Sequence, residues 1–70
     1  MEMIPVSSSN VQSVGYDSNT ETLRVEFLNG SIYEYKAVPQ AVHDELINAP
    51  SCGSYFNRNI RNIYAYERIA

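Results

Sequence analysis

The side chains best suited to ligand binding lie in the last quarter of the chain. Arg58 and Arg61 are three residues apart and share one face of a predicted helix with Asn57. Arginine forks match the geometry of phosphate, and asparagine amides can hydrogen-bond base edges. Tyr55, with Tyr64 and Tyr66 nearby, could stack on unpaired bases. Together with Lys36, these residues predict weak contact with RNA.

A solvated helix face is the commoner outcome for such a pattern. In that alternative, the arginines pair with Glu67 or with acids in the first half of the chain. Three or four basic contacts predict a log–log salt slope of only about −2 to −3 on a single strand. Any RNA binding by the isolated chain is therefore expected to be weak.

Nucleophilic chemistry has one candidate pair, Cys52 and His43. Cys52 precedes a predicted helix, whose N-terminus lowers a thiol pKa, and a histidine could act as its base. No surrounding motif supports the pairing, and a chain this short leaves little room for a substrate pocket. We therefore expect a packing role for Cys52, an exposed His43 beside Asp44, and no enzymatic activity.

Composition restricts the class of protein further. The chain has 70 residues and a net charge of −3, which indicates one domain over residues 1–70 and argues against strong nonspecific nucleic-acid binding. One cysteine and one histidine cannot form a four-ligand zinc site, and we expect no cofactor. With no apolar run of membrane-spanning length, no signal segment and no possible internal disulfide, the expected location is the cytoplasm, without membrane contact.

Three strands are predicted in the first half, over residues 11–16, 22–27 and 31–36. Residues 17–20 form a turn, because Asp and Asn side chains hydrogen-bond their own backbone. Asn29 and Gly30 signal the second hairpin. A two-residue turn there would bury Glu34, whereas a three-residue loop with left-handed Gly30 pairs Val25 with Tyr33. We prefer the three-residue loop.

That register predicts one buried and one solvated sheet face. The solvated face holds the charged residues of the last two strands. The buried face consists of Val14, Tyr16, Leu23, Val25, Phe27, Tyr33 and Tyr35. Tyr33 and Tyr35 could alternatively be a stacking platform for single strands. Because the register turns them toward the helices, we favour a core role for both.

Two helices follow the strands. Pro39 fits the first turn of a helix over residues 39–48, which ends before Pro50. Ser51 can cap a second helix over residues 53–62, whose apolar stripe includes Phe56 and Ile60. Residues 64–70 are expected to lie extended along the domain. The predicted fold is α+β: a three-stranded antiparallel meander followed by two short helices packed on one face.

The motifs resemble the KTSC domain family. They are, in order, Gly15-Tyr16-Asp17, Leu23-x-Val25-x-Phe27, Gly30-x-x-Tyr33-x-Tyr35, Val38-Pro39, the run from Gly53 to Arg61, and Tyr64-x-Tyr66-x-Arg68-Ile69. That family is named for a domain at the C-terminus of some lysyl-tRNA synthetases and also includes free-standing small bacterial and phage proteins. The resemblance implies a strand-rich first half and a helical second half. It implies little about function, and RNA as a ligand class is suggested only by the synthetase context.

Two functions from different classes remain open. The first is a non-enzymatic module that binds RNA weakly through Arg58, Arg61, Asn57, Lys36 and Tyr55. The alternative is a protein-interaction or small homo-oligomeric module, favoured by a marginal core and by exposed strand edges that invite pairing. RNA binding requires exposed, unpaired arginines, whereas the alternative requires an apolar patch or a free sheet edge.

Overall fold

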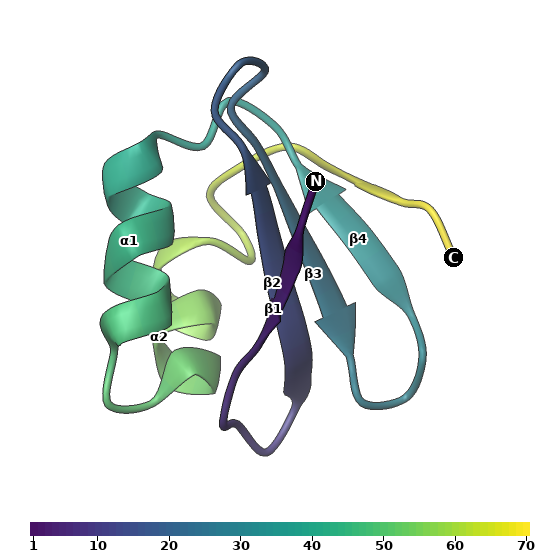
Figure 1. The fold of residues 1–70 in the computed structure, drawn as a ribbon, viewed down its shortest axis with the longest axis vertical. Helices are drawn as coiled ribbons and strands as arrows, with labels where there is room; N and C mark the ends of the chain where they lie inside the picture. The colour runs from purple at the N-terminus through teal and green to yellow at the C-terminus, as the bar shows by residue number, and fades with distance from the viewer.

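The computed structural model describes residues 1–70 and has a sheet with two helices packed on one of its faces (Figure 1). The sheet is antiparallel, and its spatial order follows the sequence order of its strands: β1 (Met3–Pro5), β2 (Val11–Asp17), β3 (Thr22–Phe27), β4 (Ile32–Tyr35) and β5 (Tyr66–Arg68). The helices are α1 (Gln40–Asn48) and α2 (Cys52–Asn59). The predicted α+β class is confirmed.

The prediction of three strands was wrong, because a short strand is added at each edge of the meander. β1 pairs with β2, and β5 pairs with β4. Each has only three residues, too few to show the alternation that identifies a strand. Pro5 lies in an edge strand, where a residue without a donor N–H is tolerated. The tail that was expected to be extended therefore completes the sheet.

The second hairpin has the predicted register. Val25 pairs with Tyr33 and Leu23 pairs with Tyr35. The Phe27 N–H donates to the Ser31 carbonyl at 2.9 Å, which closes the three-residue loop. Gly30 has a φ of 93°, a left-handed conformation that residues with a Cβ rarely adopt. The loop thus keeps both tyrosines on the same sheet face as Val25.

Both helices begin near their predicted starts, but α2 ends earlier than expected. Pro39 is the N-cap of α1, and the Ser51 hydroxyl accepts from the Ser54 N–H at 3.3 Å. The last helical residue of α2 is Asn59 rather than Asn62. The Arg61 N–H instead donates to the Phe56 carbonyl at 3.0 Å, in a wider turn. Arg61 therefore lies beyond the helix.

The core lies between the sheet and the helices. Its buried members are Val11, Val14, Leu23, Val25, Tyr35, Val38, Leu46, Cys52, Phe56 and Ile60. Three residues of the predicted buried face, Tyr16, Phe27 and Tyr33, are only half-buried and pack at its margin. Neither helix is long and apolar enough to cross a membrane.

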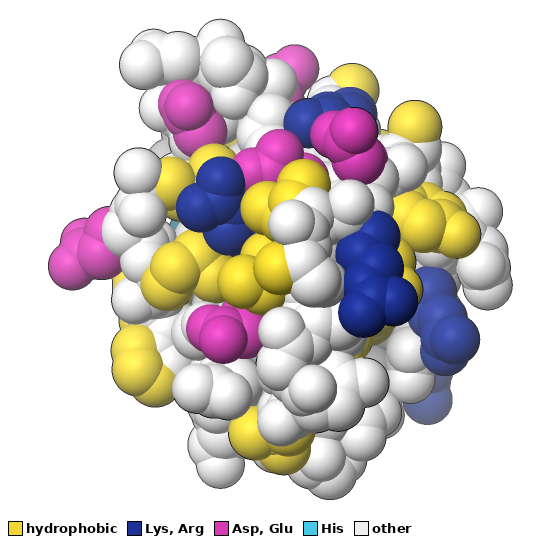
Figure 2. All heavy atoms as spheres, turned by 90° about the vertical axis from the view of Figure 1, so that its right-hand side faces the viewer, with side chains coloured by type: hydrophobic (Ala, Val, Ile, Leu, Met, Phe, Trp, Pro, Cys, Tyr) yellow, Lys and Arg dark blue, Asp and Glu magenta, His cyan; other side chains and the backbone are white.

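The opposite sheet face is less solvated than expected. The side chains of Met1 and Met3 cover Gly15, whose missing Cβ would approach the Met3 sulfur to 2.5 Å. Glu34 on β4 is only 15% exposed and pairs with Arg24 and Lys36. Figure 2 shows this side of the molecule, where apolar and charged side chains are mixed. The charges on this face are thus paired with one another rather than only solvated.

Candidate nucleic-acid interface

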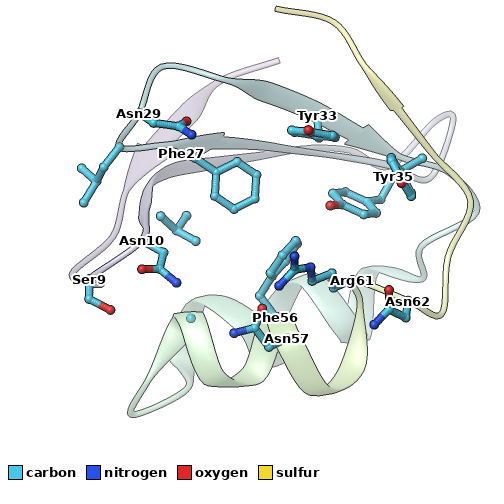
Figure 3. A pocket seen from close by; sticks show the side chains of 14 residues that line it. Ser9, Asn10, Phe27, Asn29, Tyr33, Tyr35, Phe56, Asn57, Arg61 and Asn62 are labelled. Atoms are coloured by element: carbon cyan, nitrogen blue, oxygen red, sulfur yellow. The ribbon is translucent and has the colours of Figure 1, made fainter.

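A groove of about 600 Å³ lies between the sheet and α2. In Figure 3, Phe27, Tyr33 and Tyr35 extend from the sheet, and Phe56, Asn57 and Arg61 come from α2 and the turn after it. The full lining is Ser9, Asn10, Val11, Phe27, Leu28, Asn29, Tyr33, Tyr35, Gly53, Phe56, Asn57, Arg61, Asn62 and Tyr66. Its volume lies within the usual range for small-molecule sites.

Aromatic rings form the walls of the groove as one connected set. Phe56 meets Phe27 edge-on at 5.5 Å between ring centroids and Tyr35 at 5.3 Å. Tyr33 lies 5.7 Å from both Phe27 and Tyr66. Edge-to-face and tilted contacts at these separations stabilise ring positions. The groove therefore offers fixed aromatic surfaces.

The polar part of the lining carries amides and no carboxylate. The side chains of Asn10, Asn57 and Asn62 make no hydrogen bond within the protein, so their donors and acceptors are free. Arg61 is the one charged residue in the lining. In a chain with eight acids and five bases, this groove is locally cationic. It suits a ligand that combines a flat ring, hydrogen-bonding edges and negative charge.

Arg61 acts electrostatically on the floor of the groove. Burial, with Tyr33 and Tyr66 nearby, raises the pKa of Tyr35 to about 12, while the positive charge of Arg61 acts in the opposite direction. Tyr35 is therefore neutral at physiological pH, and its hydroxyl can donate a hydrogen bond. Both residues line the groove, so one bound ligand can contact them together.

Comparison with known proteins places the chain in a family. Residues 7–64 match the family model described as the KTSC domain. The chain belongs to the KTSC domain family. A KTSC domain protein of Yersinia pestis, known from its crystal structure, is 33% identical and superposes with a TM-score of 0.93 over 99% of this chain and 97% of that one.

Relatives of this KTSC domain occur in two settings. A lysine–tRNA ligase of Trichormus variabilis is 41% identical over 68 residues, which are 97% of this chain but 12% of the ligase. An uncharacterised protein of Stutzerimonas stutzeri is 40% identical over 70 residues and 99% of each chain. The chain thus spans only a small part of the ligases that it matches.

The structure brings together two of the five residues predicted to bind RNA. Asn57 and Arg61 line the groove, while Arg58 is exposed on α2 outside the lining. Lys36 lies on the opposite sheet face, 3.2 Å from a Glu34 carboxylate oxygen. The Tyr55 hydroxyl donates to a Glu45 carboxylate oxygen at 2.8 Å and joins the two helices. Lys36 and Tyr55 are therefore not part of this site.

The arginines of the C-terminal quarter have no carboxylate partner. The ion pairs of the chain involve Arg24, Lys36 and His43, and none involves Arg58, Arg61 or Arg68. The predicted alternative, in which acidic side chains pair with these arginines, is therefore not observed.

Cys52 and His43 do not form a site. Cys52 is 4% exposed, and burial raises the pKa of its thiol, which opposes thiolate formation. His43 lines a separate pocket of about 240 Å³, where its ring stacks on Tyr16 at 4.9 Å between centroids. The expectation that His43 is exposed was wrong, because α1 turns it toward Tyr16. The packing role for Cys52 agrees with its position in the core.

Sequence reasoning missed the groove itself. Tyr33 and Tyr35 were assigned to the core, and Tyr35 is indeed buried, yet both also line the groove. Asn10 and Leu28 join the lining through the backbone pairing of their loops, where the Leu28 N–H donates to the Asn10 carbonyl at 2.9 Å. Tyr66, named from the sequence as a ring that could stack on a base, lines the groove because β5 pairs with β4.

Proposed function

We propose that this KTSC domain is a non-enzymatic module that binds unpaired RNA in the groove between its sheet and α2. The observation that carries the proposal is the lining: aromatic walls, free amides, one arginine and no acid. Proteins that bind single strands without strict sequence preference combine aromatic stacking surfaces with positive charge along the backbone path. This groove has both elements on a domain whose net charge is negative.

Two further observations support RNA as the ligand. Arg61 and Arg68 are exposed and free of ion pairs, so they can approach phosphates without first losing a partner. Related segments are parts of lysine–tRNA ligases, proteins named for a reaction on tRNA. A weak binding module attached to such an enzyme would raise the effective concentration of its RNA. An RNA ligand and a single buried cysteine both fit a cytoplasmic location.

The decisive measurement is fluorescence anisotropy with labelled single-stranded RNA, tRNA and single-stranded DNA at low and physiological salt. RNA should bind with micromolar or weaker affinity, and the affinity should fall as salt rises. Arg61→Gln should weaken binding about tenfold, because a hydrogen bond to a charged group contributes about 1.5–3 kcal/mol. Lys36→Gln is the matched control, since it removes the same charge from the opposite sheet face.

Two results would contradict the proposal. One is the absence of RNA binding even at low salt. The other is an equal loss of affinity in Arg61→Gln and Lys36→Gln, which would show attraction to net charge rather than binding in the groove. Thermal unfolding of each variant establishes that the fold is intact, so that a loss of affinity can be assigned to the removed side chain.

A protein-interaction or homo-oligomeric module is the second candidate. It is favoured by exposed apolar side chains in the C-terminal segment, where Ile63, Tyr66 and Ile69 are 63%, 59% and 43% exposed. β5 is also an edge strand and presents unpaired backbone groups. Sedimentation analysis over a hundredfold concentration range tests self-association: a constant monomer mass would remove the homo-oligomer, and a concentration-dependent dimer would favour it.

A further inference from the structure

We infer that Tyr33 stacks one unpaired base of the RNA and that Arg61 and Arg68 hold the phosphates on either side of it. This inference rests on the proposed function and deepens it, because it names the stacking ring and adds Arg68, which pairs with Tyr33 but lies beside the groove lining rather than in it. Arg58 is excluded, because it lies outside the lining and no strand pairing places it beside Tyr33. The ligand class that follows is a single-stranded segment with phosphates flanking the bound nucleotide.

The sheet register places Arg68 next to Tyr33. The two residues pair across β4 and β5, so their side chains lie on the same sheet face. Neighbouring strands are about 4.8 Å apart, which is within reach of one nucleotide. Arg61 comes from the opposite wall, in the turn after α2, as Figure 3 shows. Tyr33 therefore lies between one arginine of the sheet and one of the helical layer.

The hydrogen bonds of Arg68 leave its charged end available. Its Nε donates to the Ala70 carbonyl oxygen at 2.9 Å, which orients the guanidinium, and its terminal nitrogens make no hydrogen bond within the protein. Its neighbour Glu67 pairs with Glu34 and so lies on the other sheet face. The acid nearest in sequence thus does not compete with phosphate for Arg68.

Tyr33 is the groove ring that pairs with Arg68 and keeps part of its surface open to a base. It is half-buried and is held by Phe27, Tyr66 and Tyr35, whose centroids lie 5.7, 5.7 and 6.5 Å away. Tyr35 is only 3% exposed and cannot offer an open face. A base in a duplex is stacked and paired, so only an unpaired base can enter between the sheet and α2.

The experiment compares variants of the full chain that differ by one side chain, using an RNA pentamer of uridines and a paired RNA duplex. Tyr33→Leu should weaken pentamer binding about fivefold to a hundredfold, and Tyr33→Phe should retain it. Arg61→Gln and Arg68→Gln should each make the log–log salt slope shallower by about 0.7. Arg58→Gln is the matched control and should leave the slope unchanged, since Arg58 is an exposed, unpaired arginine on α2 that neither lines the groove nor pairs with Tyr33.

A second measurement does not depend on the stability of any variant. A pentamer with a photoreactive 4-thiouridine at its centre is crosslinked to the unmodified protein, and the attached residue is identified by mass spectrometry. Attachment at Tyr33 or at a residue in contact with it supports the inference. Attachment on the outer sheet face or on the exposed side of α2 overturns it.

The outcomes separate this inference from the proposed function. If the pentamer binds and Arg58→Gln lowers the slope as much as Arg68→Gln, RNA binding stands and the assignment of Arg68 is wrong. If the pentamer binds and Tyr33→Leu has no effect, the stacking ring is wrong. If the duplex binds as tightly as the pentamer, the groove is not the site. If no RNA binds, the proposed function fails and this inference fails with it.

Discussion

Replacing Glu34 by glutamine should destabilise the sheet, because Glu34 neutralises the charges on its outer face. One carboxylate oxygen accepts from Arg24 Nη2 at 2.6 Å and from Arg24 Nε at 3.0 Å. The other oxygen accepts from Lys36 Nζ at 3.2 Å. Glu67 of β5 lies directly opposite Glu34, so the basic partners also offset repulsion between two acids.

The size of the effect follows from exposure. A hydrogen bond to a charged group contributes about 1.5–3 kcal/mol net, but Arg24 is 34% exposed and solvent screens the pair. The more exposed Lys36 contributes less than about 1 kcal/mol. We expect Glu34→Gln to lower the free energy of unfolding by about 1–2 kcal/mol. In a domain of this size, each 1 kcal/mol lowers Tm by about 4–8 °C.

The pH dependence distinguishes charge from shape. Hydrogen bonds from Arg24 and then Lys36 hold the pKa of Glu34 below its usual range. A lowered folded-state pKa contributes stability above the unfolded pKa, near 4.5, and this contribution is lost as pH falls through the folded value. The difference between the wild type and Glu34→Gln should therefore be full at neutral pH and shrink in acid.

Urea unfolding followed by circular dichroism at about pH 7 and about pH 2 measures both quantities. Glu67→Gln is the matched control: it removes an exposed acid from the same face and should be neutral or slightly stabilising. The reasoning is refuted if the Glu34→Gln difference is as large at low pH as at neutral pH. It is equally refuted if Glu67→Gln costs as much.

Three other substitutions test the packing. Gly15→Ala should destabilise the protein by about 1–3 kcal/mol, because the new Cβ would lie 3.0 Å from the Glu2 backbone carbonyl and against the Met3 side chain. The loss should be seen as a lower Tm. An unchanged Tm would mean that β1 is not held against β2. Tyr55→Phe should cost about 1 kcal/mol in urea unfolding by removing the bond to Glu45. Burial and that bond raise the pKa of Tyr55 to about 12, so its contribution should be lost as pH rises from 10 to about 12. Ser51→Ala should cost about 1 kcal/mol through loss of the α2 cap, and a smaller loss in Ser51→Gly is the expected contrast.

Local physics made the centre of the fold predictable. The cost of burying Glu34 selected the three-residue loop, and the observed pairing of Val25 with Tyr33 confirms that choice. Pro50 signalled the end of α1 and Ser51 the start of α2, and the Ser51 cap is formed as expected. The turn, proline and cap signals depend only on residues that are close together in the chain, so they can be identified from a single sequence.

The missed features depend on contacts distant in sequence. β1 and β5 are strands only because β2 and β4 present unpaired edges to them, and three residues carry too little pattern alone. The end of α2 at Asn59 was missed because helical periodicity continues through Ile63, while the observed chain leaves the helix at Ile60. That early end decides the site, since it directs Arg61 into the groove rather than along the helix face.

The groove lies where it does because the two helices cover only part of one sheet face. α1 and α2 pack over the centre of the sheet, where Leu46, Phe56 and Ile60 are buried, whereas β5 adds a strand at the far edge (Figure 1). A strand edge left open would expose backbone groups and invite aggregation. β5 covers the edge of β4, and it carries Tyr66 and Arg68 onto the helix-bearing face at a place where the helices leave both side chains exposed. A chain too small to close both layers fully therefore leaves aromatic and cationic side chains at one end of its core, which is where a ligand can supply the missing contacts.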